Sequence, residues 1–255
     1  MRINKSLWII SVAGIMTVFS GCGKKTGDST SSSAAAIPLP DPPLVFQGEP
    51  GIRGGHLIVA EFGDPKTFNP ITQNESSSDA LIRFMFVAML GFDWPSQKAI
   101  PGLAESWSVE ADNMTWTFKL RKNLKWSDGH PLTADDVVFT CNDVIYNPAV
   151  NNVTRDALQV DGKPFQVSKV DDLTVKVVTA APFAPFEETF GAGVTILPKH
   201  VLAQAVAGKK FEAAYGVDAK PEELVCNGPF KLRSYKPGES TTLERNPYFF
   251  EVESR

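Results

Sequence analysis

The sequence contains few of the residues from which metal centres and catalytic sites are usually built. Its 255 residues include only three histidines and three cysteines. His56, His130 and His200 are far apart in the chain, and no histidine or cysteine stands at the spacing of a zinc site. GxSxG, HExxH, P-loop and dinucleotide-binding fingerprints are absent as well. We therefore expect no metal, no cofactor and no catalytic centre.

A strong charge of either sign is also missing. Lys and Arg number 25 against 29 Asp and Glu, and the net charge is -4. No basic stripe could release counterions from phosphates, which excludes nucleic acid as a partner. The acidic residues that are adjacent in sequence diverge on a helix or strand, so they are expected to cap helices and face solvent rather than form acid–base dyads. These pairs are Asp135-Asp136, Asp171-Asp172, Glu187-Glu188 and Glu222-Glu223.

The N-terminus carries an apolar run that is too short for a transmembrane helix, which takes about 20 residues. Arg2 and Lys5 precede an uncharged stretch over residues 7–19. This pattern predicts a signal peptide over residues 1–21 and an exported protein.

Cys22 follows the small pair Ser20-Gly21, and this arrangement resembles a bacterial lipobox. Cys22 is therefore the expected lipidation site, which would anchor the chain to a membrane in the cell envelope, in the periplasm or another extracytoplasmic position. Phe19 departs from the Leu, Val or Ile that usually stands three positions before such a cysteine. The alternative is an ordinary secretion signal in which Cys22 is incidental.

Residues 22–50 are rich in Ser, Ala and Pro and include PLPDPPLVF near their end. They cannot bury enough apolar surface to offset chain entropy, so they are predicted to form a disordered tether. Residues 51–255 are then the folded body. Its two cysteines, Cys141 and Cys226, could pair in an exported protein. Because Cys141 lies on the apolar stripe of a predicted helix, two separate buried thiols are favoured.

Residues 103–146 organise the body. Trp116, Phe118 and Leu120 alternate with polar residues, which predicts a strand with one buried face. A Ser-Asp-Gly turn follows, and then Thr133 and Asp136 stand at the spacing of a helix capping box. Apolar residues recur after them on one helical stripe. These are Val137, Val138, Cys141, Val144 and Ile145. The pattern predicts an α/β fold.

Further elements are predicted along the rest of the chain. Residues 56–60 (HLIVA) predict a strand of core type, and Ser77 or Ser78 is expected to cap a helix, apolar on nearly all sides, that continues to Leu90. Turns at Asp161-Gly162 and Pro237-Gly238 predict two hairpins. Pro198 stands at an expected helix start.

Several motifs, in order, resemble the extracellular solute-binding proteins of the peptide, dipeptide and nickel type (family 5), which are the receptors of ABC importers. They are LAESW, FKLRKNLKWSDGHPLTADDVVF, NGPFKL and LERNPYF. The resemblance implies a periplasmic-binding-protein-like α/β fold (type II), with a mixed sheet and flanking helices. It also implies two hinged lobes that enclose a peptide or similar small solute and present it to a membrane permease. The expected protein is a monomer and not an enzyme.

The resemblance places the loop after residues 56–60 at the ligand cleft. Thr72, Gln73, Asn74 and Glu75 are therefore the candidate ligand-binding residues, and Asn227, in the NGPFKL motif, is a further one. The alternative for the loop is a solvated segment that only caps the next helix. In the family, most of the second lobe follows the NPYF motif. The chain is therefore expected to be a truncated receptor that holds the first lobe, over residues 51–255, and binds ligand weakly by itself.

Two other functions fit parts of the pattern. A lipid-anchored hydrolase would need Ser127, Asp128 and His130 to converge, with His130 pointing into a pocket beside a nucleophile. A sensory or adhesion lipoprotein would keep the fold and bind another protein in place of a transported solute.

Overall fold

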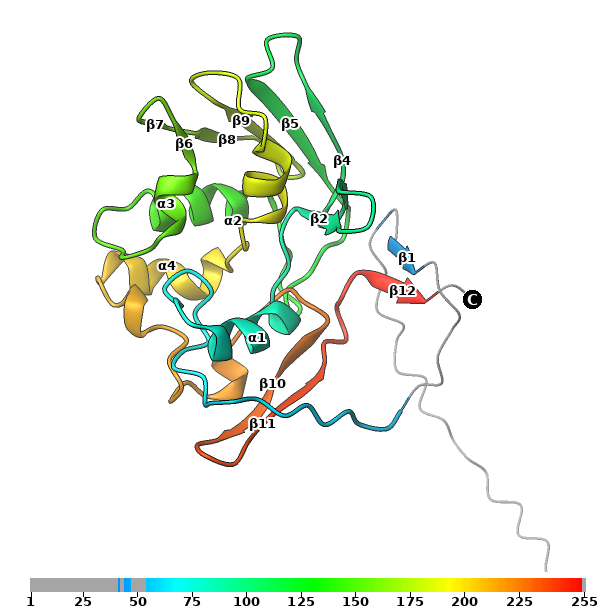
Figure 1. The fold of residues 1–255 in the computed structure, drawn as a ribbon, viewed down its shortest axis with the longest axis vertical. Coiled ribbons are helices and arrows are strands. Elements are labelled where there is room, and N and C mark those ends of the chain that lie inside the picture. The colour runs from blue at the N-terminus through cyan, green and yellow to red at the C-terminus, as the bar shows by residue number, and fades with distance from the viewer. Residues whose placement is uncertain (1–40, 42–43, 47–53, 254–255) are drawn as a thin grey trace, which may run out of the picture. The chain divides into compact units, whose positions relative to one another are not determined.

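The largest sheet in the part of the chain that the structure describes has four strands. The computed structural model describes Asp41, residues 44–46 and residues 54–253, all within one compact unit that extends from residue 37 to residue 255. The predicted signal peptide, Cys22 and most of the predicted tether lie outside these residues. The sheet order is β4 (Ala104–Val109), β5 (Thr115–Leu120), β9 (Thr174–Val178) and β8 (Gln166–Asp171), as Figure 1 shows.

Strand β5 has the buried face that its alternating sequence predicts. Trp116, Phe118 and Leu120 are at most 8% exposed. The Trp116 ring stacks on Phe186 with 4.3 Å between ring centroids, and Phe186 in turn stacks on Phe190. Phe186 directly precedes the π-helical segment η2 (Glu187–Ala192). This segment therefore supplies the aromatic layer that covers the sheet.

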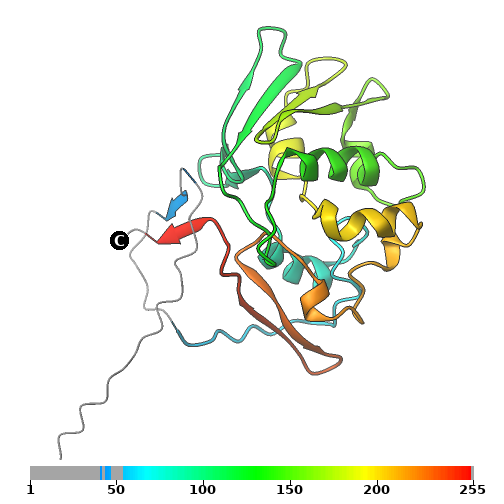
Figure 2. The same ribbon diagram turned by 180° about the vertical axis from the view of Figure 1, so that it is seen from behind.

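The predicted capping box is present at the start of helix α2 (Ala134–Val138). The Thr133 hydroxyl accepts a hydrogen bond from the Asp135 backbone N–H, and the Asp136 carboxylate accepts one from the Thr133 N–H at 2.9 Å. The helix continues as the π-helical segment η1 (Phe139–Ile145), and its predicted apolar stripe is buried apart from the half-buried Val138. Helix α2 packs on β8 and β9, while α4 (Lys199–Ala207) contacts η1, which can be followed in Figure 2.

The remaining elements are short. The predicted hairpins are confirmed as β6 (Gln159–Val160) with β7 (Lys163–Pro164), and β10 (Phe230–Lys236) with β11 (Ser240–Arg245). A third hairpin pairs β2 (Leu90–Asp93) with β3 (Lys98–Pro101). The short helical segments are α3 (Thr154–Ala157), η3 (Phe211–Ala213) and η4 (Pro221–Glu223). Pro198 caps α4 as expected.

Parallel pairing in the described residues occurs between β1 (Leu44–Phe46) and β12 (Glu251–Glu253). Close to β1, Asp41 exchanges two backbone hydrogen bonds of 3.1 Å with Lys122. The prediction of a disordered tether is therefore wrong for Asp41 and residues 44–46, because backbone groups far along the chain pair with them. The central four-stranded sheet is antiparallel throughout.

The predicted strand over residues 56–60 is not formed. The segment has no strand neighbour among the described residues, and Leu57 and Ile58 are 88% and 86% exposed. A run of this type becomes a strand only when neighbouring backbone pairs with it. The sequence of residues 56–60 is of a type found in strands, but it does not specify a neighbouring strand to pair with.

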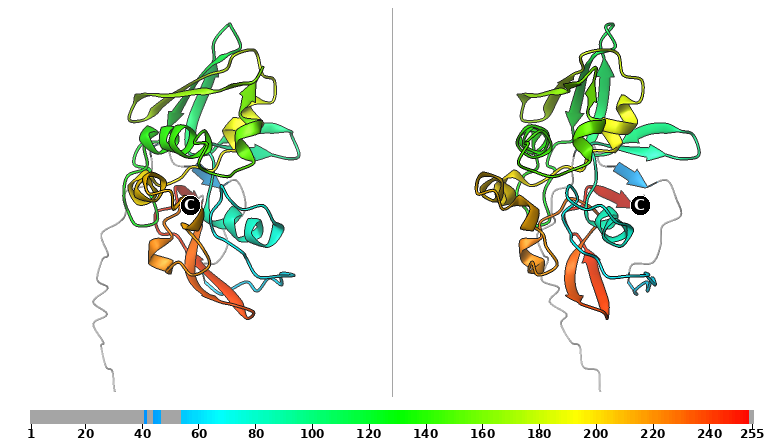
Figure 3. Two further views of the ribbon diagram at one scale, coloured as in Figure 1. Left: turned by 90° about the vertical axis from the view of Figure 1, so that its left-hand side faces the viewer. Right: turned by 60° about the vertical axis from the view of Figure 1, so that its left-hand side comes forward.

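Helix α1 (Ser76–Met85) begins and ends earlier than predicted. Glu75 caps it in place of Ser77 or Ser78, and the Ser78 hydroxyl turns inward to accept hydrogen bonds from the backbone of Lys66 and Thr67. Only one face is buried, since Phe84 is 49% exposed. Figure 3 shows α1 beside the β10–β11 hairpin, which it contacts through β10.

Cys141 and Cys226 are two separate buried thiols, as favoured from the sequence. Burial raises the pKa of both to about 12. Within residues 54–253, no helix has the length and apolar character that a membrane crossing demands.

Candidate functional site

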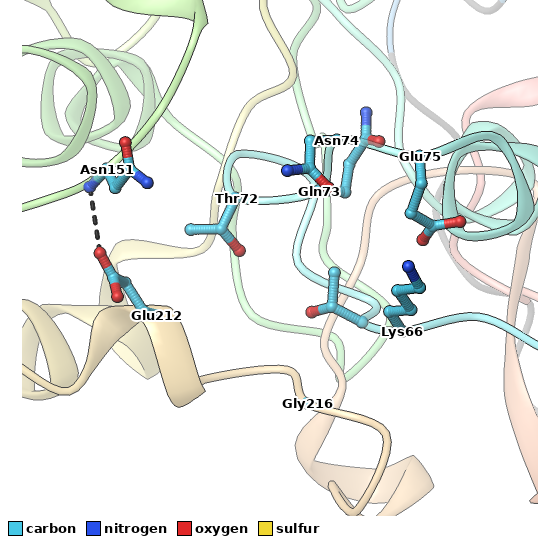
Figure 4. Close-up of a pocket in the computed structure, with 9 residues that line it drawn as sticks. Lys66, Thr72, Gln73, Asn74, Glu75, Asn151, Glu212 and Gly216 are labelled. Carbon is cyan, nitrogen blue, oxygen red and sulfur yellow. Dashed lines mark hydrogen bonds between the residues drawn. The ribbon is translucent and has the colours of Figure 1, made fainter.

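An open polar pocket of about 290 Å³ lies beside the loop that leads into α1. Four of the five predicted ligand-binding residues line it, and they come from consecutive positions in that loop. Figure 4 shows Glu212 and Asn151 at one end and Lys66 and Glu75 at the other, with Thr72 between them. The lining residues are Lys66, Thr67, Thr72, Gln73, Asn74, Glu75, Asn151, Glu212 and Gly216.

Asn69 holds the two walls of this pocket together. Its side chain is fully buried. The Nδ2 group donates to the carbonyls of Phe211 and Ala214, at 3.1 Å each. Its Oδ1 atom accepts from the backbone N–H of Ile71 and Thr72. An Asn-Pro pair is typical of a turn, and the local sequence gives no sign of this long-range role.

Glu75 shapes the pocket through the start of α1. Its carboxylate accepts hydrogen bonds from the backbone N–H groups of Ser77 and Ser78 and from the Ser77 hydroxyl. Burial by itself raises the pKa of Glu75, but these hydrogen bonds outweigh it and lower the pKa from 4.5 to about 2. The Glu75 carboxylate therefore caps α1. For Glu75, this agrees with the alternative prediction that the loop only caps the next helix. Thr72, Gln73 and Asn74 have side chains that are not engaged in this cap.

We expect Glu75→Gln to reduce the pH dependence of stability at acidic pH. Because the folded-state pKa is depressed, the carboxylate stabilises the fold above its unfolded pKa, and that contribution is lost as the pH falls from about 5 toward about 2. Urea unfolding at stepped pH should give a shallower decline for the variant than for the wild type. Glu61→Gln, at an exposed position, is the control and should follow the wild type. Equal slopes for wild type and Glu75→Gln would contradict the assignment.

The opposite wall comes from residues far along the chain. Glu212 accepts a hydrogen bond of 3.2 Å from the Asn151 backbone N–H. Lys66 and Glu212 thus place one positive and one negative side chain at opposite ends of the pocket (Figure 4). Local sequence patterns gave no sign of Asn151 or Glu212.

Asn227 lies away from the pocket. Its side chain is 2% exposed and pairs with the backbone of Val87, accepting from the N–H at 2.9 Å and donating to the carbonyl at 3.1 Å. The helix ends at Met85 and Phe86 is already extended, so the pairing holds non-helical backbone where the sequence predicted helix up to Leu90. The structure therefore brings Thr72, Gln73, Asn74 and Glu75 together at the pocket. Asn227 instead binds the backbone of Val87.

Two of the three histidines meet in the structure, although their spacing gave no sign of it. The rings of His130 and His200 stack with centroids 3.9 Å apart. The Asp128 carboxylate contacts His200 Nε2 at 2.8 Å and accepts from the His130 backbone N–H. Burial raises the pKa of Asp128, but the hydrogen bonds from His200 and His130 prevail and lower it.

This cluster does not meet the requirement of the hydrolase hypothesis. His130 is exposed at a turn, with Nδ1 3.1 Å from the Pro131 carbonyl. The Ser127 hydroxyl is occupied as the acceptor of the Cys226 N–H. Across the described ranges, no group of three or more His, Cys, Asp or Glu side chains is placed to hold a metal ion.

The fold and the pocket define a class of protein, namely an α/β lobe with an open polar pocket. The model of the middle region of the bacterial extracellular solute-binding proteins of family 5 matches residues 98–254. The chain belongs to this family, as its motifs indicated.

Known proteins of this kind are similar over most of the chain. A Deinococcus radiodurans protein described as "Probable ABC transporter-binding protein" is 31% identical over 87% of this chain. The crystal structure of Haemophilus influenzae OppA with the peptide RPPGFSPFR matches 74% of the chain at 29% identity, with a TM-score of 0.61. The periplasmic binding protein MelB from Agrobacterium fabrum, in complex with stachyose, matches 75% at 25% identity, with a TM-score of 0.66.

These similarities confirm the predicted type II periplasmic-binding-protein fold. The chain covers only part of each similar protein: 38% of the Deinococcus relative, 37% of the OppA chain and 30% of the MelB chain. The family consists of solute-binding proteins, and its described relatives belong to ABC transport.

Proposed function

We propose that the chain is part of the substrate-binding receptor of an ABC importer and forms one wall of an interlobe cleft for peptides or a similar small solute. The observation that carries this proposal is the family match over residues 98–254. The polar pocket beside the loop before α1 supports it, because the pocket is open to solvent. A second lobe would have to close over such a site before water could be excluded.

The chemistry of the pocket favours a peptide. Amide and hydroxyl groups from Thr72, Gln73 and Asn74 can pair with the N–H and C=O groups of an extended main chain. Lys66 and Glu212 offer opposite charges to the ends of a short peptide. An oligosaccharide is the second candidate, since the MelB complex contains stachyose. Among the described residues that line the pocket none is aromatic, so no ring is available there for stacking on a sugar.

The proposal includes the setting of the receptor. Cys22 is the proposed lipid attachment site, residues 22–40 are the proposed tether, and the body works as a monomer outside the cytoplasm against permease subunits of the importer. The sequence pattern at Ser20-Gly21-Cys22 supports the anchor. A sensory or adhesion lipoprotein remains the alternative use of the same fold, and it predicts no binding of small solutes.

A nuclear magnetic resonance titration of the full chain tests this proposal. Trialanine should shift the amide signals of Thr72, Gln73 and Asn74, with a dissociation constant on the order of 1 mM or weaker, because the pocket is open to water. Stachyose at the same concentration should leave them unchanged. Gln73→Ala should reduce the shifts, whereas Gln166→Ala, on exposed strand β8, should not. Shifts with stachyose alone would favour the sugar, and none with either ligand would count against a solute site in this loop.

A further inference from the structure

Two contacts between titratable side chains join the first turn of α4 to the turn at residues 126–131. The imidazole rings of His130 and His200 stack with 3.9 Å between their centroids and an angle of 10° between their planes. The Asp128 carboxylate contacts Nε2 of His200 at 2.8 Å, and these two side chains are 34% and 22% exposed. Histidine changes its charge between about pH 8 and about pH 5, so the charge at this contact depends on pH.

Both rings are held in this arrangement when they take up protons. In a protonated imidazole both nitrogens carry a hydrogen. Nδ1 of His130 then donates to the Pro131 carbonyl, which is 3.1 Å away, and Nε2 of His200 donates to Asp128. These hydrogen bonds keep two positive rings face to face. The Asp128 carboxylate compensates for one of the two charges, and the second is repelled by the first.

The surrounding groups do not remove this repulsion. The other titratable and charged side chains around the stack are Lys125, Asp135, Asp136, Lys199, Tyr215, Cys226 and Tyr248. The two lysines add positive charge. The buried hydroxyl and thiol stay uncharged, because burial raises the pKa of Tyr215 and of Cys226. The Asp136 carboxylate favours a charge on His200, whereas the ring of His130 contacts a backbone carbonyl instead of a carboxylate.

We propose that this contact is a pH-sensitive switch, which opens when both rings are protonated and then loosens the pocket wall that carries Glu212. Helix α4 leads from the contact to this wall. The Lys210 N–H donates to the Ala205 carbonyl at 2.8 Å, and η3, which includes Glu212, packs against α4. When the first turn of α4 leaves the turn at residues 126–131, the helix tilts and η3 moves with it.

Hydrogen exchange measured by nuclear magnetic resonance on the full chain, at about pH 7.5 and about pH 5, tests the switch. Protection factors are compared, because they exclude the intrinsic effect of pH on exchange. The amides of Val201 and Leu202 in α4, and that of Asn151, which donates to Glu212, should lose about fivefold or more of their protection at the lower pH. About 1 M sodium chloride should reduce the loss, since it screens charges more than about 3 Å apart.

Three variants separate the stack from other effects of acid. His130→Phe keeps a ring in the stack but removes the second charge, so it should retain protection at about pH 5. His56→Phe, at an exposed position outside the contact, is the matched control and should lose protection as the wild type does. Asp128→Asn keeps an oxygen for the His130 backbone N–H and removes the compensating charge. Its contact should open at a higher pH, because the closed form then binds protons less well than the open form.

Equal losses of protection in the wild type and His130→Phe would overturn the proposal. They would identify the carboxyl group of Asp136, whose pKa is raised by burial, as the acid-sensitive group. Full protection in a wild type whose imidazole nitrogen shifts show two protonated rings would overturn it too, as would a stack that takes up one proton only at about pH 5. An Asn151 amide that stays protected while Val201 and Leu202 open would overturn the link to the pocket. No ligand is added, so the result is independent of the titration that tests solute binding.

Discussion

Replacing Asn69 by leucine is expected to lower the free energy of unfolding by about 3 kcal/mol or more. The substitution keeps the branched shape of the side chain but leaves two carbonyls, of Phe211 and Ala214, and two N–H groups, of Ile71 and Thr72, without their partner. Each unsatisfied buried group costs about 1–3 kcal/mol, although local relaxation lets water reach some of them. Urea unfolding followed by far-ultraviolet circular dichroism measures the loss.

The control for this prediction is Asn74→Leu, in the same loop at an exposed position, which should change stability by less than about 0.5 kcal/mol. Asn69→Leu should also speed hydrogen exchange at residues 71–72 more than elsewhere, since these amides lose their acceptor. A variant within about 1 kcal/mol of the wild type would mean that Asn69 does not hold the pocket walls together.

Gly228→Ala is expected to be at least as damaging, at about 3 kcal/mol or more, for a steric reason. A Cβ atom at this position would lie 2.5 Å from the carbonyl carbon of Met85 and 2.7 Å from its oxygen. These are backbone atoms, and the Gly228 N–H also donates to that oxygen at 2.7 Å. The adjacent pairing of Asn227 with Val87 restricts relaxation, so the strain cannot be relieved by a rotamer change.

Gly63→Ala is the matched control, because nothing lies within 4 Å of a Cβ added there. It should unfold at the same urea concentration as the wild type. If Gly228→Ala is already largely unfolded without urea, the fraction folded is compared at low temperature by near-ultraviolet circular dichroism. A urea midpoint equal to that of the wild type would show that the end of α1 and the turn at residues 226–229 can move apart to accept the added methyl group. This result would contradict the tight contact between Gly228 and the Met85 backbone.

The sequence predicted those features whose cause is local. The capping box of Thr133 and Asp136, the alternation in β5 and the turn at Asp161-Gly162 each depend on residues a few positions apart, and the structure confirms all three. The family resemblance predicts ligand contacts for the loop of Thr72; this loop lines a polar pocket, and its ligand contacts stay a prediction.

The remaining features depend on contacts between distant parts of the chain. Asn69 and Asn227 stand in Asn-Pro and Asn-Gly pairs that are typical of turns, but each side chain binds backbone more than 100 positions away. His130 and His200 meet only because α4 packs beside the helix that follows the Ser-Asp-Gly turn. The strand predicted over residues 56–60 failed for the same reason, since pairing depends on backbone that its own sequence does not specify.

The parallel pairing of β1 with β12 has a mechanical consequence. Leu44 is opposite Glu251 and Phe46 is opposite Glu253, so both strands point the same way. Consider a force that pulls on the chain before Leu44 while the chain after Glu253 is held. In a parallel pair these two points lie at opposite ends of the ribbon, so the force slides the strands along each other. Such shear loads the interstrand hydrogen bonds together, whereas peeling would break them one at a time. The membrane anchor proposed at Cys22 would therefore load this pairing in shear and would not peel the short strand away from one end.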